Sequence, residues 1–463
     1  MLPMFLGSVD QTLLATATPR IGAELGRLSD TSWIAIGYLL AATVMAPVYG
    51  RLGDRYGRRN ALLAALCIFA AGSIVCATAV NLPMLIAARS VQGLGGGGLM
   101  VMSQALIGEL VPPRLRPAYQ GYFALVFTCS SIGGPLLGGF VVNHASWRWL
   151  FLVNLPLCAF AAWRVTRLPH SSTTLPTPLQ HPPLDRIGVL LFALTACSGL
   201  LWFSLGGHRF AWLSATSAAL LLFALTAGSL LAWQQRRQTS PFLPLDVLRL
   251  PGVRWSCLSV MCFASGLFAL IFLLPIYAQV GHGSSAAGAG LQLLPLTAGM
   301  VVGSALNGRI AAWTGIVGRT PRWGLGAASL ALLALALAPS SPTTTMCAAA
   351  VCGLGFGMVM PNAQITTQMR AGRERLGAAA ALLALTRSSG AALGTAVFSG
   401  LAFALLSTAP GPRGTGAAFG AVAPAEVAQA FHIVFGALAA CMALGAWCAT
   451  RMPVLALAGD ETA

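Results

Sequence analysis

Long apolar stretches recur from one end of the chain to the other, and they constrain the fold more than any other feature. A helix that crosses a membrane needs about 20 predominantly apolar residues. Because hydrocarbon offers no partner to free backbone N–H and C=O groups, such stretches must be helical. The sequence therefore predicts an all-α integral membrane protein with fourteen transmembrane helices, at 2–20, 33–50, 61–80, 83–108, 117–142, 149–167, 187–206, 211–232, 255–279, 288–311, 323–339, 343–366, 377–407 and 429–450.

The basic residues indicate how these helices are oriented. The chain has no lysine, so all 27 basic residues are arginines. If the N-terminus is cytoplasmic, twenty of them fall in inner connections or the tail and five in outer connections. Cytoplasmic loops carry an excess of positive charge. We therefore expect a multi-pass protein with both termini in the cytoplasm, and we attribute the net charge of +16 to topology, with no nucleic-acid partner.

Several kinds of chemistry are excluded by the residues the sequence lacks. Without lysine there is no phosphate-binding loop of the G-x-x-x-x-G-K-[ST] type and no Schiff-base lysine. The glycines from Gly93 to Gly98 lie in an apolar stretch and favour close helix packing. The eleven cysteines and six histidines show no metal-binding spacing. We expect no enzyme, no metal and no cofactor, with an ion gradient or a partner subunit as the energy source.

One carboxylate, Asp10, lies deep inside a predicted span, while the other acidic residues fall at span ends, in connections or in the tail. An ionisable group at this depth is costly and marks a proton carrier or a cation ligand. Arg89 and Gln92 lie at a similar depth, so they would meet Asp10 if the two helices face a common cavity. Two alternatives stay open: Asp10 as a neutral packing residue, and Arg89 extended to the outer surface.

The stretch from Gly50 to Arg59, GRLGDRYGRR, combines glycines with a lone aspartate between arginines. Glycines permit a tight turn, and Asp54 can cap a helix or pair with the arginines. A partial copy, GRIAAWTG, begins at Gly308. Duplication of a helical unit is typical of secondary transporters, which bind their substrates between the halves.

These motifs resemble those of the major facilitator superfamily. Residues 50–59 resemble its cytoplasmic latch between helices 2 and 3, and Arg89, Gln92 and Gly93 resemble a helix-4 motif of its proton-coupled exporters. Residues 130–139, SSIGGPLLGG, resemble its antiporter motif. The run 146–156, SWRWLFLVNLP, is similar to one in its fourteen-helix drug:proton antiporter family.

The resemblance implies two six-helix bundles related by pseudo-twofold symmetry, at 1–168 and 255–463. Between them, 169–254 forms a linker with two inserted central helices. It implies a proton-coupled exporter of small lipophilic or cationic compounds in the bacterial cytoplasmic (inner) membrane. The partners would be protons, a small-molecule substrate and the lipid bilayer. We expect a monomer, with a periplasmic adaptor and an outer-membrane protein as further candidate partners.

The same resemblance, together with depth in the predicted spans, assigns four groups of site residues. They are Asp10 and Arg89 for proton coupling; Gln11, Tyr38, Gln92, Tyr277, Asn362 and Arg387 for the substrate cavity; Gly50, Asp54, Arg55, Gly57, Arg58 and Glu109 for the latch; and Gly134, Pro135, Gly138 and Gly139 for the antiporter motif. For Arg387, a structural role holding helix ends is an open alternative.

Two other functions are compatible with the sequence. The chain could export a specific metabolite, siderophore or self-made antibiotic, or it could be a membrane sensor or scaffold that transports nothing. A scaffold would not need Asp10.

Overall fold

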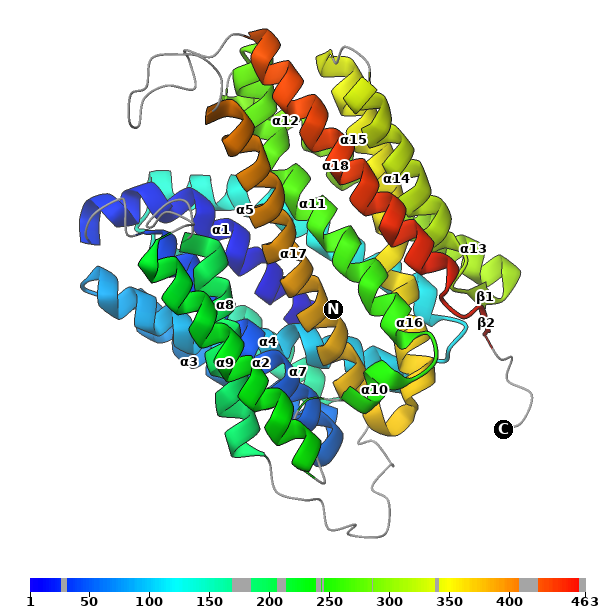
Figure 1. Cartoon of the computed structure of the whole chain (residues 1–463). Helices are drawn as coiled ribbons and strands as arrows, with labels where there is room; N and C mark the ends of the chain where they lie inside the picture. Colours follow the sequence, from blue (N-terminus) through cyan, green and yellow to red (C-terminus); the bar gives the residue numbers. More distant parts are fainter. Residues whose placement is uncertain are drawn as a thin grey trace. The chain divides into compact units, whose positions relative to one another are not determined.

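The computed structural model describes residues 1–25, 31–168, 185–205, 214–238, 243, 245–284, 286–337, 341–407 and 424–457 of the 463-residue chain. These residues are helical apart from short connections and two short strands (Figure 1). The chain divides into two compact units. Unit 1 comprises Met1–Pro112, Leu125–Leu248 and Ala371–Leu385, and unit 2 comprises Pro113–Ala124, Arg249–Arg370 and Thr386–Ala463. The predicted linker boundary at 168/169 borders residues outside the described part, and the three predicted domains stay a prediction.

Unit 1 is built from the helices of the first half of the sequence. They are α1 (Leu2–Leu25), α2 (Ser32–Tyr56), α3 (Arg58–Ala77), α4 (Leu82–Leu110), most of α5 (Arg116–His144), α6 (Trp149–Leu152), α7 (Asn154–Thr166), α8 (Arg186–Leu205), α9 (Ala215–Arg237) and α10 (Leu245–Arg249). The 3-10 turn Arg373–Arg375 and the start of α17 (Leu376–Ser407) also belong to it.

Unit 2 contains most of the remaining elements. They are α11 (Val253–His282), α12 (Ala286–Leu291), α13 (Leu294–Thr314), β1 (Ile316–Val317), α14 (Thr320–Leu337), α15 (Pro342–Gly357), α16 (Val359–Ala371), the rest of α17, α18 (Pro424–Thr450) and β2 (Leu455–Ala456). In this unit α14 packs against α15 and α18, and α11 packs against α18.

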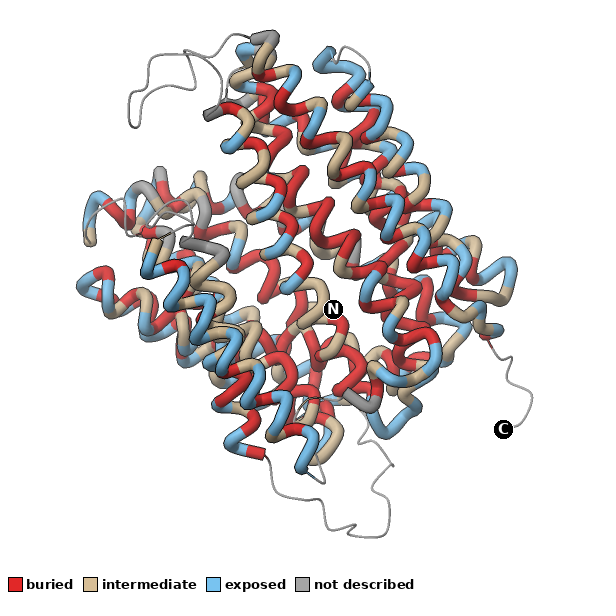
Figure 2. Tube along the Cα trace, in the orientation of Figure 1, coloured by how far each residue is buried: buried red, intermediate tan, exposed pale blue. Residues whose placement is uncertain are grey.

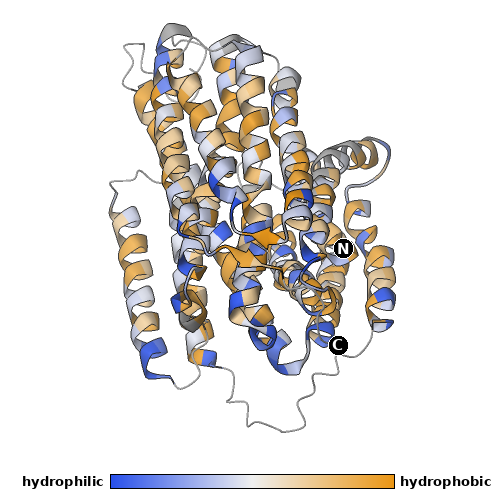
Figure 3. Cartoon of the chain, turned by 90° about the vertical axis from the view of Figure 1, so that its right-hand side faces the viewer, coloured by the Kyte–Doolittle hydropathy of each residue, from blue (hydrophilic) through white to orange (hydrophobic). Residues whose placement is uncertain are grey.

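Each of the fourteen predicted spans is mostly helical over its described residues. Ten helical stretches of the described part are long and apolar enough to cross a membrane by length and composition. Figure 3 shows hydrophobic residues along the helices, with hydrophilic ones gathered near helix ends. The helical membrane fold is therefore confirmed, while a count of fourteen crossings stays a prediction.

Three of the predicted spans are broken, and a proline explains each break. Proline lacks an N–H and clashes with the carbonyl of the residue four positions earlier. The helices α6, α12 and α15 end at Leu152, Leu291 and Gly357, each four residues before Pro156, Pro295 or Pro361. Pro47 and Pro275, in contrast, lie inside uninterrupted helices. The sequence alone had not indicated which prolines would interrupt a span.

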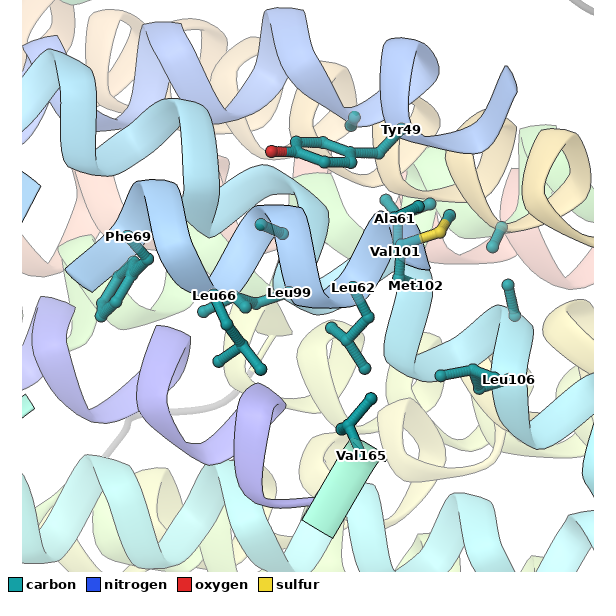
Figure 4. Close-up of a cluster of buried hydrophobic side chains, with 14 of the residues drawn as sticks. Tyr49, Ala61, Leu62, Leu66, Phe69, Leu99, Val101, Met102, Leu106 and Val165 are labelled. Carbon is teal, nitrogen blue, oxygen red and sulfur yellow. The ribbon is translucent and has the colours of Figure 1, made fainter. Parts of the chain in front are cut away.

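The glycine run in α4 allows α2 and α3 to approach it closely. A Cβ at Gly95 would lie 2.5 Å from the backbone nitrogen of Phe69, and one at Gly98 would lie 2.7 Å from Cβ of Ala65. A Cβ at Gly97 would collide with the carbonyl oxygen of Ala42 in α2. The predicted packing role of this run is confirmed. Apolar side chains from α2, α3, α4 and α7 fill the adjoining core (Figure 4).

Unit 2 has a different arrangement at the place of the partial latch copy. β1 directly follows α13 and pairs antiparallel with β2 near the C-terminus, with Ile316 opposite Ala456. Asn362 in α16 donates to Asn307 Oδ1 (2.6 Å) and to Thr320 Oγ1 (2.7 Å), and its own Oδ1 accepts from the N–H of Gly318 (2.8 Å). Neutral hydrogen bonds therefore stabilise this end of unit 2.

Candidate functional site

A buried ion pair joins α1 to α4 in unit 1. Arg89 Nη1 lies 2.5 Å from Asp10 Oδ2, and the side chains are 1% and 3% exposed. The same Nη1 donates to Gln92 Oε1, one turn further along α4, at 2.5 Å. The sequence predicted that these three residues could meet, and the structure places them in direct contact.

Neutral donors occupy the other oxygen of Asp10. Gln92 Nε2 donates to Oδ1 at 3.0 Å and also to Ser73 Oγ of α3 at 2.8 Å. Asn154, the first residue of α7, donates to the same Oδ1 at 2.9 Å. Both carboxylate oxygens are therefore hydrogen-bonded, as the charged form of a buried acid requires. Four helices, α1, α3, α4 and α7, contribute to this one network.

Aromatic rings line the guanidinium of Arg89. Its central carbon lies 4.4 Å from the ring centroid of Tyr38 and 5.9 Å from that of Phe151. The Tyr38 hydroxyl hydrogen-bonds with Gln11 of α1, whose side chain is exposed. Glycines in α4 make room for Tyr38, since a Cβ at Gly93 or Gly96 would collide with it. Two predicted cavity residues, Gln11 and Tyr38, thus adjoin the ion pair.

In this arrangement the charge of Asp10 and its contact with Arg89 depend on each other. Removing one partner of a buried pair costs about 3–5 kcal/mol because the other charge is left unpaired. A proton on Asp10 would neutralise the carboxylate and release Arg89, which stays cationic and must find another acceptor. The network can therefore hold one arrangement of α1 and α4 when Asp10 is charged and release it when Asp10 is neutral.

The predicted antiporter motif in α5 packs against α1 next to Asp10. A Cβ at Gly134 would collide with Thr12, and one at Gly138 would collide with Thr16 and lie 2.8 Å from the carbonyl oxygen of Leu13. Thr12 also donates to the carbonyl of Ser130 at 2.8 Å. Gly139 has no atom within 4 Å of such a Cβ. Pro135 lies inside the uninterrupted helix.

The predicted latch residue Asp54 contacts the first turn of α17 within unit 1. Its Oδ1 accepts from the N–H of Gly377 (2.9 Å) and its Oδ2 from the N–H of Ala378 (2.9 Å). A carboxylate at this position caps the helix and matches the positive end of its dipole. Asp54 Oδ1 also accepts from Arg58 Nη2 at 2.9 Å.

Arg58 extends the latch to two further residues. Its Nη1 lies 2.9 Å from Glu109 Oε2 at the end of α4, and its Nη2 donates to the carbonyl of Arg373 at 2.7 Å. Arg58 is thus the latch arginine that pairs with Glu109; Arg55 lies against the ring of Tyr56.

At two positions of the latch, the structure explains why the residue is glycine. Gly57 connects α2 to α3 with φ of 89°, a conformation that favours glycine. A Cβ at Gly50 would lie 2.7 Å from the carbonyl oxygen of Gly377 and 2.9 Å from Cβ of Ala381. Gly50 therefore permits the close contact between α2 and the start of α17.

The three predicted cavity residues of unit 2 have different surroundings. Tyr277 in α11 is buried against Phe431 and Phe435 of α18, with ring centroids 4.7 and 5.5 Å away. Asn362 belongs to the neutral network at the ends of α13, α14 and α16. Arg387 lies inside α17. The structure gathers the predicted site residues of unit 1 but does not gather these three.

At the end of α1, residues of the W-R-W run form a second hydrogen-bonded cluster in unit 1. Trp147 Nε1 donates to Glu24 Oε2 at 2.7 Å, and Arg148 Nη1 lies 2.6 Å from Glu24 Oε1. Arg148 Nη2 also donates to the carbonyl of Ala79 at 3.2 Å. This cluster ties the end of α1 to the connections before α4 and α6. The hydrogen bond from Arg148, with that from Trp147, holds the pKa of Glu24 below its ordinary value of 4.5.

Sequence reasoning missed two residues of the Asp10 network, Asn154 and Ser73. Asn154 carried a usable signal, since an amide side chain inside an apolar span needs a partner. Ser73 carried little signal, because serine can satisfy its hydroxyl within its own helix. In the structure it also donates to the carbonyl of Phe69 at 2.9 Å.

The fold and the buried site together define a helical membrane transporter. A model of the Major Facilitator Superfamily matches residues 1–395, and the chain belongs to this superfamily. It is not an enzyme. In fold it is similar to the proton:xylose symporter XylE, with a TM-score of 0.65 and 13% identity over 96% of this chain and 93% of that one.

Sequence relatives include proteins of two bacteria. An uncharacterised transporter of Mycobacterium tuberculosis is 33% identical over 86% of this chain and 58% of its own length. This chain thus spans little more than half of that relative. The multidrug transporter protein MdtP of Bacillus subtilis is 31% identical over 85% of this chain and 72% of its own length.

The packing of α5 on α1 predicts opposite outcomes for two neighbouring glycines. Gly138→Ala should push α1 from α5 and lower the free energy of unfolding by about 1–3 kcal/mol, the usual cost of overpacking. Gly139→Ala is the matched control and should change it little. Thermal unfolding of both variants in detergent measures the difference. Equal stability of the two would show that α5 does not hold α1 in this way.

The lowered pKa of Glu24 predicts a pH-dependent stability. A carboxylate with a depressed pKa stabilises the fold above its unfolded value, and this contribution disappears as the pH falls through the folded value. The protein should therefore lose stability as the pH drops below about 4.5, and Glu24→Gln should remove part of that loss. Because Glu24 is 44% exposed, the effect should stay below about 1 kcal/mol. Thermal unfolding from pH 7 to 4 measures it, with Glu426→Gln as control. An unchanged pH slope in Glu24→Gln would contradict the assignment.

Proposed function

We propose that the protein is a proton-coupled exporter of small lipophilic compounds, working by alternating access. The observation that carries this proposal is the Asp10–Arg89 pair, a carboxylate buried within a membrane-spanning unit and hydrogen-bonded through both oxygens. A purely structural site would not need a charge at this depth, where apolar packing is cheaper. A relative named as a multidrug transporter supports the type of cargo, and a relative named as an efflux pump supports the direction of transport.

In this proposal the proton and the helix contacts exclude each other. With Asp10 charged, Arg89, Gln92 and Asn154 hold α1 against α4 and α7. With Asp10 protonated, the attraction to Arg89 is lost and α1 is released. Because a ligand shifts an equilibrium only by binding its two states differently, the proton must favour the released state. Proton entry then drives the change that exports the cargo.

The latch supplies the second part of the cycle. Asp54, Arg58 and Glu109 hold the start of α17, which comes from the second half of the sequence. Breaking these contacts would free the start of α17 from α2 and α3. We infer that they stabilise one of the two access states.

The proposal also assigns the protein to a family of antiporters, to a membrane and to a topology. The fourteen predicted spans and the W-R-W run favour the fourteen-helix drug:proton antiporter family. We infer an inner-membrane protein with both termini in the cytoplasm and Gly134, Pro135, Gly138 and Gly139 as its antiporter motif. The helices α8 and α9 pack on each other, and α8 also packs on α2. We infer that they are the two inserted helices.

Asp10→Asn tests the proposal. Asparagine keeps the size of the aspartate and one of its two acceptor oxygens, but it carries no negative charge and cannot exchange a proton. In proteoliposomes with an imposed pH gradient, the variant should fall to the transport level of empty liposomes for a panel of lipophilic cations, neutral compounds and organic anions. The matched control is Asp185→Asn, because Asp185 is also buried but is held by Gln234 and Gln235 away from α1.

The outcomes separate the candidate functions. Undiminished gradient-driven transport by Asp10→Asn would remove the proton role of Asp10. Transport of one metabolite class alone by the parent protein would indicate a specific metabolite exporter. No transport by a folded parent would indicate a sensor or scaffold.

A further inference from the structure

Arg387 is a cation in the interior of a membrane helix. It lies eleven residues into α17, about 16 Å from its first residue at 1.5 Å per residue. The stretch Arg373–Leu406 is one of the candidate membrane spans. The side chain is half-buried, so part of its surface is accessible to a molecule of the size of water. A guanidinium stays protonated in proteins, so its charge persists at this depth.

Within the described part of the chain, Arg387 has no ion pair and no hydrogen-bond acceptor, and no other charged group acts on it. Among the described residues of unit 2 the only acid is Glu426, in the first turn of α18. Figure 1 shows that α18 begins near the end of the unit where α17 finishes, twenty residues or about 30 Å from Arg387 along the helix. Unit 2 therefore does not neutralise this charge.

The contrast with Arg89 shows what is missing. Both arginines lie inside membrane helices, but Arg89 has a carboxylate at 2.5 Å and an amide oxygen at the same distance. Ionisable groups within a membrane are almost always paired. A structural arginine that holds helix ends would donate to backbone carbonyls, and Arg387 donates to none of those described. The described residues of unit 2 thus leave Arg387 free to bind an acceptor from outside the chain.

The backbone around Arg387 is fixed by close packing. One turn further along α17, Gly390 lies so close to α11 that a Cβ there would be 2.5 Å from the carbonyl oxygen of Met261. Ser265 of α11 donates to the carbonyl of Gly390 at 2.8 Å. Thr386 hydrogen-bonds with Cys257 of the same helix. The backbone that carries Arg387 is thus packed firmly on α11, so binding a ligand would not require ordering the helix.

Helices α11 and α16 of unit 2 are buried over most of their lengths (Figure 2). Three side chains of α16 have buried polar atoms with no hydrogen-bond partner among the described residues. Gln364 is fully buried, and neither its amide nitrogen nor its amide oxygen has a partner. The hydroxyls of Thr366 and Thr367 are also buried without partners. Native proteins seldom leave such groups unsatisfied, and the exceptions call for a water or a ligand.

We propose that Arg387 binds the anionic group of the exported molecule, so that the cargo is a lipophilic organic anion such as a carboxylate or a sulfonate. This inference rests on the proposed export function and differs from the lipophilic or cationic cargo that the family resemblance implies. A cationic cargo would be repelled by Arg387. An anion offers Arg387 the bidentate oxygen pair that a guanidinium binds best.

Three probes with one aromatic body test the proposal. They are 2-naphthoate, 2-naphthamide and (2-naphthylmethyl)trimethylammonium, which differ in charge. Binding to the purified protein in phosphatidylcholine nanodiscs is measured by calorimetry. The parent should bind 2-naphthoate about tenfold or more tighter than 2-naphthamide, the advantage expected of a charge-assisted hydrogen bond. The cation should bind weakest.

Variants at Arg387 show whether this side chain causes the preference. Arg387→Gln should remove the difference between naphthoate and naphthamide, while Arg387→Lys should retain part of it and guards against a folding defect. Arg451→Gln, an exposed arginine at the end of α18, is the control and should bind like the parent. A preference that persists in Arg387→Gln would overturn the proposal, as would tighter binding of the cation by the parent.

Lipid phosphate is the other source of the same chemistry. If phosphatidylglycerol nanodiscs abolish naphthoate binding, the anion at Arg387 is a lipid headgroup and the proposal falls. The proposed function is judged separately by transport. Gradient-driven export of cations would support the proposed function and contradict anion binding at Arg387. Binding of 2-naphthoate without gradient-driven transport would support anion binding and contradict the proposed function.

Discussion

The rest of unit 1 depends on the ion pair between Asp10 and Arg89. Its partners come from four helices: Asp10 from α1, Ser73 from α3, Arg89 and Gln92 from α4, and Asn154 from α7. The glycines of α4 and α5 follow from the same constraint, because they let α2 and α1 approach closely enough for the side chains to meet. A pair of opposite charges in a low-dielectric interior is stable only when further hydrogen bonds support it, and both oxygens of Asp10 accept such bonds.

The two halves of the sequence have diverged in how they use charge. The first half has the Asp10 pair and the Asp54–Arg58–Glu109 latch. In the second half, at the partial copy of the latch, the structure has Asn307, Thr320 and Asn362 in a neutral network and the β1–β2 pair that ties the C-terminal residues to α13. Neutral hydrogen bonds do not respond to a proton near neutral pH, whereas a carboxylate can. We therefore assign the proposed protonation step to unit 1, whereas unit 2 has Arg387 inside a candidate membrane span.

Much of this could be predicted from the sequence because apolar length and isolated charge are strong signals. The helices followed from the apolar stretches, and the meeting of Asp10, Arg89 and Gln92 followed from their similar depth. The sequence did not predict the helix breaks after Leu152, Leu291 and Gly357. A proline does not always break a helix, since Pro47 and Pro275 lie inside uninterrupted ones. The β1–β2 pair did not follow either, since two-residue strands far apart in the chain leave no periodic pattern. The role of Asn154 required knowing which helix faces Asp10.

The central claim is that Asp10 exchanges a proton and that this exchange controls its contact with Arg89. Infrared difference spectroscopy of the purified protein, recorded as the pH is lowered, observes the carboxyl group directly. The account predicts a protonated-carboxyl band that is present in the parent, absent in Asp10→Asn, and accompanied by a change in the guanidinium bands of Arg89 that Arg89→Lys removes. Identical difference spectra for the parent and Asp10→Asn over the whole pH range in which the protein stays folded would contradict it.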